Sequence, residues 1–199
     1  LALGGNLVGS ATINGMRNLT AVRIGENATV VTDGRLDLLA NLQREGENFT
    51  DLNRVRSRGN AGETAFNLVA AAGAAMAGTV TLDGDRNEAS IGAGADVTAG
   101  QGVDVRATTN HDFQNRAIGG SLSTLFAASF GAAFTVADTE AVAEVAGSVD
   151  AGAGTLEVVA TTDVEYTPEA VGLAAGGLVA VGGAVEVNAV ANDTRAAIT

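Results

Sequence analysis

Few side chains in this sequence could do chemistry. There is one histidine, His111, in the segment TTNHDFQ, and there is no cysteine. A Ser-His-Asp triad or a multi-histidine metal site would have to be built around His111 alone, and thiol nucleophiles and zinc–thiolate sites are excluded. His111 follows a predicted strand, and Val164 occupies its position in the internal repeat described below. We interpret His111 as a solvated loop residue rather than a catalytic base.

Acidic residues offer one possible cation site. Asp83 and Asp85 stand in the tripeptide DGD, and Glu88 follows, so that their oxygens could coordinate Ca²⁺. The EF-hand pattern fails after its first residues, and no GGxGxD calcium repeat is present. The pattern favours a turn with acidic tips.

Three further carboxylates, Asp96, Asp104 and Asp150, deserve comparison with β-helical polysaccharide lyases, which use clustered Asp, Arg or Lys on one face. Here the three residues point outward from separate predicted strands, and no spacing places two carboxylates beside a cation. We therefore predict no catalytic residue, no cofactor-binding residue, no metal ligand and no enzymatic activity.

The charge of the chain limits its partners. The formal net charge is −12, and all 11 basic residues are arginine. Such a surface repels nucleic acids and anionic lipid headgroups, so we expect neither as a partner. The one basic cluster is RVRSR at 54–58, which could dock an acidic partner or a sulfated glycan but is interleaved with acidic residues as in a solvated segment.

The elements that must position these residues recur along the chain. Residues 88–110 (EASIGAGADVTAGQGVDVRATTN) match residues 143–163 (AEVAGSVDAGAGTLEVVATTD), and a second block recurs at 7–24, 130–145 and 181–198. The aliphatic residues that anchor this alignment stand 67, 54 and 53 residues apart: Ile24, Ile91, Val145 and Ile198. The repeat is therefore about 54 residues long.

The first interval is longer by about thirteen residues, and the excess falls in the highly charged segment 41–63. We predict one β-solenoid over 1–199, a fragment of a longer chain, with repeats at approximately 1–40, 64–91, 92–145 and 146–199. The segment 41–63 is predicted to be a polar insertion that projects from one coil.

Hydrophobic periodicity favours strands over helices. Val103 and Val105 alternate with Asp104 and Arg106, as in a strand of about five residues, and Val185 and Val187 alternate with Glu186 and Asn188 in the same way. Charge-free runs at 65–82, 117–137 and 170–185 contain Gly-Gly pairs or polar interruptions and lack aromatic belts, so we predict no membrane span.

Short strands joined by glycine corners predict an all-β fold, a parallel β-helix or β-solenoid. A coil of such folds takes roughly 18 to 25 residues, so we expect two to three coils per repeat and favour three, with a right-handed winding.

The segment GGLVAVGGAVEVNAVANDTRAAI, preceded by AGAGTLEVVATTD, resembles repeats of large secreted bacterial adhesins and leukotoxin-like filamentous proteins. The resemblance covers residues 64–199 and, more loosely, 1–40. It implies a β-helical stalk or passenger region of an extracellular, cell-surface protein.

Our first hypothesis is a structural and adhesive module whose partners are neighbouring repeats or identical subunits stacked end to end, with a host-cell or surface glycan as a possible receptor. Two alternatives remain: a carbohydrate-active enzyme, and a secreted leukotoxin-like cytotoxin. Loss of glycan degradation on changing Asp83, Asp104 or His111 to Ala would favour the enzyme.

Overall fold

The computed structural model describes residues 5–48, 60–66 and 72–199, and this part of the chain is all β. No helix long and apolar enough to cross a membrane occurs in it. The strands are β1 (Gly5–Met16), β2 (Leu19–Ile24), β3 (Thr29–Thr32), β4 (Leu36–Asn48), β5 (Asn60–Phe66), β6 (Ala72–Ile91), β7 (Asp96–Ala99), β8 (Val103–Ser123), β9 (Phe126–Val145), β10 (Ser148–Asp150), β11 (Leu156–Gly176) and β12 (Val179–Ile198).

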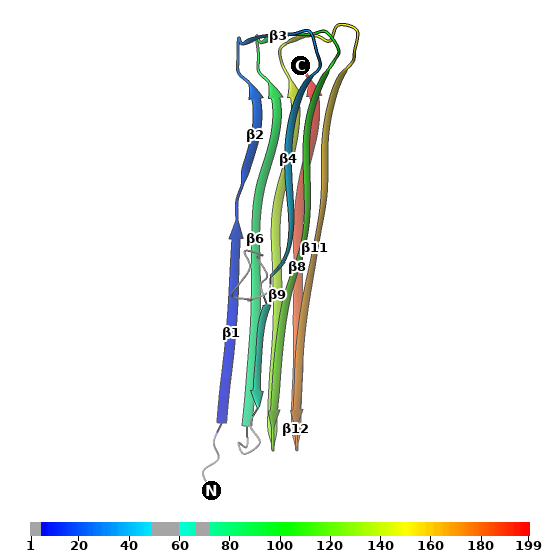
Figure 1. Cartoon of the computed structure of the whole chain (residues 1–199). Coiled ribbons are helices and arrows are strands. Elements are labelled where there is room, and N and C mark those ends of the chain that lie inside the picture. The colour runs from blue at the N-terminus through cyan, green and yellow to red at the C-terminus, as the bar shows by residue number, and fades with distance from the viewer. Residues whose placement is uncertain (1–4, 49–59, 67–71) are drawn as a thin grey trace.

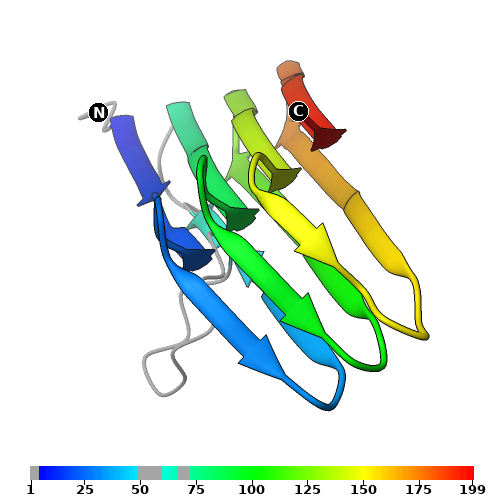
Figure 2. The ribbon, with the colours of Figure 1, turned by 90° about the horizontal axis from the view of Figure 1, so that it is seen from above.

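The strands form three parallel sheets. The first sheet contains β1, β2, β6, β9 and β12, the short second sheet contains β3, β7 and β10, and the third sheet contains β4, β5, β8 and β11. In each coil the chain runs along the first sheet, crosses one end through the second sheet and returns along the third (Figures 1 and 2). The predicted all-β, parallel β-helical fold is confirmed.

One coil uses one whole sequence repeat. Ala72 of β6 pairs with Phe126 of β9, which pairs with Val179 of β12, so the register advances by 54 and then 53 residues. The prediction of two to three coils per repeat is therefore wrong, and so is the prediction of five-residue strands, because β6, β9 and β12 each have 20 residues. Many of the glycines that the sequence suggested as corners lie inside these strands, where two sheets approach closely.

The register also locates the extra residues of the first coil. Asn48 pairs with Asn115 and Asn60 pairs with Arg116, so that adjacent residues of β8 face partners separated by residues 49–59. The predicted insertion 41–63 thus shares its first and last residues with β4 and β5. Residues 49–59, including the basic cluster at 54–58, lie outside the described residues.

The interior is aliphatic at the end closed by the second sheet. Val97, Val103 and Val105 are fully buried there, together with Ile91 and Val145. Ile91 pairs with both Ile24 and Val145, which confirms the alignment that defined the repeat. Since burial of a Val or Ile side chain contributes about 1.5–3 kcal/mol, this cluster is the main apolar core.

Toward the opposite end, small side chains replace the aliphatic ones. Ala77, Ala117 and Ala133 are buried between the first and third sheets. A Cβ on Gly119 would lie 2.7 Å from the carbonyl oxygen of Phe130, so the two backbones are almost in contact. The interior is thin here because its residues carry little side-chain volume.

Large apolar side chains at this end point outward from the first sheet. We call this surface the apolar face. It covers 72–84 of β6, 126–136 of β9 and 179–191 of β12, and its outward positions there carry no charge. Its exposed residues are Leu7, Ile13, Met76, Leu82, Phe126, Phe130, Phe134, Val136, Val179, Val181, Val185 and Val187. Farther along the same sheet, ion pairs such as Arg23–Glu88 and Arg86–Glu140 connect neighbouring coils.

Candidate functional site

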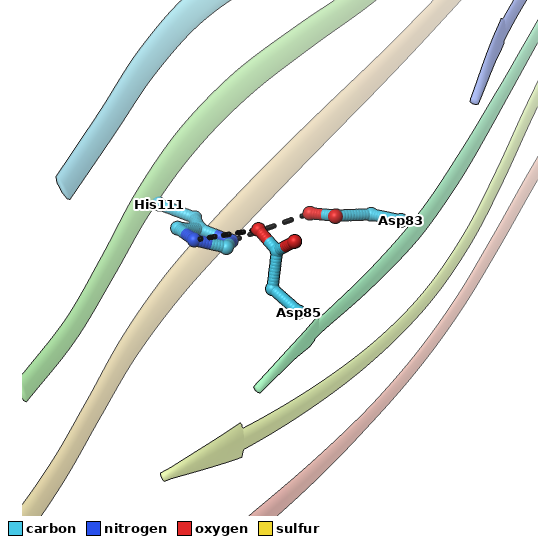
Figure 3. Close-up of side chains that lie close together, drawn as sticks. All are labelled: Asp83, Asp85 and His111. Atoms are coloured by element: carbon cyan, nitrogen blue, oxygen red, sulfur yellow. Dashed lines mark ion pairs between the residues drawn. The ribbon is translucent and has the colours of Figure 1, made fainter. Parts of the chain in front are cut away.

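A buried cluster of two aspartates and one histidine lies midway along the second coil, which consists of β6, β7 and β8. Asp83 and Asp85 point inward from β6, because residues two apart in a strand share a face, and His111 points toward them from β8 (Figure 3). The three side chains have no solvent-accessible surface. His111 Nδ1 is 3.3 Å from Asp83 Oδ2, and His111 Nε2 is 3.3 Å from Asp85 Oδ2.

Two predictions are corrected by this cluster. His111 is not a solvated loop residue, because β8 continues from Val103 to Ser123 and buries the imidazole between two sheets. The DGD segment is not an acidic turn, because it lies inside β6. Glu88 belongs to the opposite face of that strand, where it forms an ion pair with Arg23, and so it is not part of the cluster.

Tyr166 of β11 completes the surroundings of the cluster. Its hydroxyl donates a hydrogen bond to Asp83 Oδ2 and lies 3.4 Å from His111 Nδ1. Burial, which disfavours the phenolate, and the hydrogen bond to Asp83 raise the pKa of Tyr166 well above its ordinary value. Tyr166 is therefore a neutral donor, a role that the sequence analysis did not identify.

Aromatic packing fixes the orientation of these rings. Phe113 stacks on Tyr166 with ring centroids 5.5 Å apart and an interplanar angle of 9°. The ring of His111 meets Phe113 edge-on at 5.8 Å. Because close-packed rings cannot turn freely, His111 keeps one nitrogen toward Tyr166 and Asp83 and the other toward Asp85.

These contacts define the tautomer of His111. The Tyr166 hydroxyl donates its proton to Asp83, so its oxygen can accept a hydrogen bond only from a protonated Nδ1 of His111. In the neutral imidazole, Nε2 then carries a lone pair, and it forms no hydrogen bond. Nε2 faces Asp85 Oδ2 at 3.3 Å, within ion-pair distance of that carboxylate.

The cluster has the ligand types and dimensions of a metal site. One ligand atom each from Asp83, Asp85 and His111 can be chosen so that all three lie within 4.8 Å of one another. Imidazole nitrogen combined with carboxylate oxygen suits divalent transition metals, including zinc. The backbone N–H of Asn18 donates to Asp85 Oδ1 at 2.6 Å, which holds that carboxylate in place.

A surface hollow lies on the outside of the first sheet, next to the strand that carries Asp85. It has a volume of about 690 Å³ and lies where β1 ends and β2 begins. Its lining includes Arg17, Asn18, Asp85, Arg86, Asp138 and Glu140. The side chains of Asp83, Asp85 and His111 have no solvent-accessible surface, so the hollow lies beside the cluster and does not open onto it.

The other candidate carboxylates lie elsewhere. Asp96 and Asp150 are exposed on the second sheet, in β7 and β10. Asp104 alternates with core residues as predicted, but it is buried beneath Arg35 and Arg106, whose guanidinium nitrogens lie 3.2 and 3.3 Å from Asp104 Oδ2. None of the three joins the cluster around His111.

Comparison of the chain with family models, with curated proteins and with solved structures finds no match.

Proposed function

We propose that this chain is a structural and adhesive β-solenoid module of a large extracellular bacterial surface or filament-forming protein. The observation that best supports the proposal is the constant register between coils. Every residue of β6 pairs with the residue 54 positions later in β9, and every residue of β12 pairs with the residue 53 positions earlier. Coils that stack in this way are interchangeable units of one long body.

The open edge of β12 supports assembly along the solenoid axis. Within the described residues, β12 pairs with β9 on one side and with no strand on the other. A strand of 20 residues with one unpaired edge presents a row of backbone donors and acceptors that another strand can satisfy. The partner is either a further coil of the same protein or an identical subunit.

The apolar face supports a lateral contact as well. Phe126, Phe130 and Phe134 are 49%, 39% and 37% exposed. Their side chains form one row on the outward face of β9. Exposed apolar surfaces of this extent mark interaction sites in soluble proteins. We propose that the apolar face binds the apolar face of a second copy. The rows of Phe side chains on the two copies have the same spacing and can therefore interdigitate.

The coil dimensions favour a broad contact surface over a slender stalk. A strand of 20 residues spans roughly 66 Å. Each coil adds only about 4.8 Å along the axis. Most residues of a coil therefore lie in the two wide sheets, and wide sheets suit adhesion and lateral association.

The alternative of a carbohydrate-active enzyme is not favoured by the cluster around His111. Glycosidases need carboxylates that flank the bond they cleave. The side chains of Asp83 and Asp85 are fully buried, so a polysaccharide cannot contact them.

The experiment that tests the proposal is sedimentation velocity over a concentration series, together with electron microscopy of the same samples. We expect concentration-dependent assembly of residues 1–199 and loss of lateral association in a Phe130→Asp/Phe134→Asp variant. The matched control is Thr161→Asp/Thr167→Asp, which adds the same charge to exposed positions of the third sheet. A chain that stays monomeric at every concentration, or a double Phe variant that assembles like the control, would contradict the proposal. Labelling of intact cells with an antibody to this chain checks the extracellular location.

A further inference from the structure

We propose that two copies of this chain pair through their apolar faces in one arrangement, with a two-fold axis and antiparallel strands, so that Phe134 of each copy enters an apolar hollow of the other. The inference rests on the proposed function, because it specifies the lateral contact proposed there. It is supported by the shape of the apolar face, by the position of the charged residues and by the area of the face.

The apolar hollow lies at the start of the long strands of the first sheet and has a volume of about 490 Å³. Every residue that lines it is apolar or glycine. Ala74 of β6 and Ala128 of β9 pair in register, so their small side chains leave the hollow between the larger side chains of Leu7, Phe126 and Val181. Interfaces commonly bury an aromatic ring of the partner in a pocket of this kind.

Large and small outward residues alternate along β9. Phe126, Phe130 and Phe134 are separated by Ala128 and Ala132. We place a second copy antiparallel over the first, with the two-fold axis midway between Phe130 and Ala132. Phe134 then faces Ala128 of the second copy, at its apolar hollow, and Phe130 faces its Ala132. The phenylalanine rows of the two copies therefore interdigitate in this arrangement.

The neighbouring strand shows the same fit. Met76 and Gly78 of β6 pair in register with Phe130 and Ala132. In the antiparallel arrangement, Met76 of one copy therefore faces Gly78 of the other. A Cβ on Gly78 would meet nothing within 4 Å, so the surface is open there, and Met76 is 54% exposed and can fill it.

The charged half of the first sheet decides between the two orientations. Asp138, Glu140 and Glu144 occupy outward positions of β9 beyond Val136. In the antiparallel arrangement these positions lie past the start of β9 of the second copy, so their carboxylates stay in water. A two-fold axis along the strands would instead place Glu140 and Glu144 opposite their own counterparts, and juxtaposed like charges are costly.

The apolar face is large enough for a stable contact. The 72–84 segment of β6 spans roughly 43 Å, and the four neighbouring strands β1, β6, β9 and β12 span roughly 19 Å. Their product is about 800 Å² on each copy, which is the usual area per partner in specific protein–protein interfaces. A lipid surface would not require large residues to match small ones, so the shape of the face favours a second copy.

Exchange of two residues tests the fit. Phe134→Ala leaves the hollow of the other copy empty and Ala128→Phe fills it, so each single variant should weaken dimerisation at least about tenfold. In the double variant Ala128→Phe/Phe134→Ala a ring again faces a small residue, and the dissociation constant should return close to that of the wild type. Sedimentation velocity measures these constants. The control is Thr161→Phe, which adds the same ring to an exposed position of the third sheet and should change nothing.

A distance measurement tests the orientation separately. The chain contains no cysteine, so Asp138→Cys carries one spin label per chain. In the antiparallel dimer the two labels should lie roughly 45 Å apart along the strands, whereas a parallel pairing would place them roughly 10–20 Å apart, across the two packed sheets. Pulsed electron paramagnetic resonance distinguishes these distances.

The short distance, or a double variant that dimerises as weakly as the single variants, would overturn the inference. In both cases the chain still associates through its apolar face, so the proposed function survives. A chain that stays monomeric at every concentration overturns both proposals. If that monomer binds phosphatidylcholine vesicles and Phe134→Ala weakens the binding, the apolar face is a lipid-binding surface instead.

Discussion

Gly131 of β9 lies against Val171 of β11 so closely that a Cβ on Gly131 would stand 2.5 Å from the Val171 carbonyl oxygen. The two residues belong to different sheets, so the first and third sheets meet backbone to backbone at this point. Glycine is needed here for close approach and not for a turn.

We predict that Gly131→Ala destabilises the protein by about 1–3 kcal/mol, because overpacking forces the backbone of Val171 to move. Chemical denaturation followed by circular dichroism measures this change. The control is Gly78→Ala in β6, where an added Cβ meets nothing within 4 Å. Equal stability of the two variants would show that the sheets are farther apart than described.

Ile91 should be one of the most sensitive core positions. Its side chain is fully buried between Ile24 and Val145. We predict that Ile91→Ala lowers the free energy of unfolding by about 2–5 kcal/mol, the usual cost of deleting a buried aliphatic side chain. The same substitution at Ile13, which is 74% exposed, should change stability little. A large loss at Ile13 instead would place the core on the other face of the first sheet.

Asn87 connects the first sheet to the third. Its Nδ2 donates hydrogen bonds to the carbonyl oxygen of Ala40 at 3.0 Å and to that of Thr108 at 2.7 Å. We predict that Asn87→Ala costs about 1–3 kcal/mol of unfolding free energy, because buried carbonyl groups lose their donor. Asn110→Ala, at an exposed position of β8, is the control and should be close to neutral. If both variants unfold at the same denaturant concentration, Asn87 does not bridge the sheets.

Glu88 should make the free energy of unfolding depend on pH in the acidic range. Burial raises its pKa, but hydrogen bonds from Arg23 and Ser90 outweigh burial, so the net pKa lies below the ordinary value of 4.5. A carboxyl with a depressed folded pKa stabilises the protein fully above its unfolded pKa and loses that contribution as the pH falls through the folded pKa. We predict that Arg23→Gln makes the protein less stable at neutral pH and that this difference shrinks below about pH 4. Denaturation at several pH values checks this, and a difference that does not vary with pH would contradict the role of Glu88.

The sequence was sufficient to predict the fold class and the alignment of coils. Ile24, Ile91 and Val145 were aligned because an aliphatic residue precedes a similar turn each time, and the structure stacks them directly. The length of a coil was not predictable in the same way. A glycine such as Gly131 can mark a corner or a close approach of two backbones, and composition does not distinguish the two.

The cluster around His111 was missed for two related reasons. The polar run after Thr109 was read as the end of a strand, although His111, Phe113 and Asn115 continue the inward alternation of β8. Asp83 and Asp85 show the same period of two, but the glycine between them suggested a turn. Tyr166 could not be connected to His111 by local pattern, because the two are 55 residues apart and meet only when the coils stack.

The tight links at 124–125 and 177–178 begin the circuits that start with β9 and β12 at equivalent places. Recombination between repeats at the level of the gene can therefore delete or duplicate a circuit while leaving every surviving strand with its inward residues still inward. A single-codon insertion within a 20-residue strand has the opposite effect, because it moves every later side chain of that strand to the other face of the sheet. Natural variants of this chain should accordingly differ in length by whole circuits.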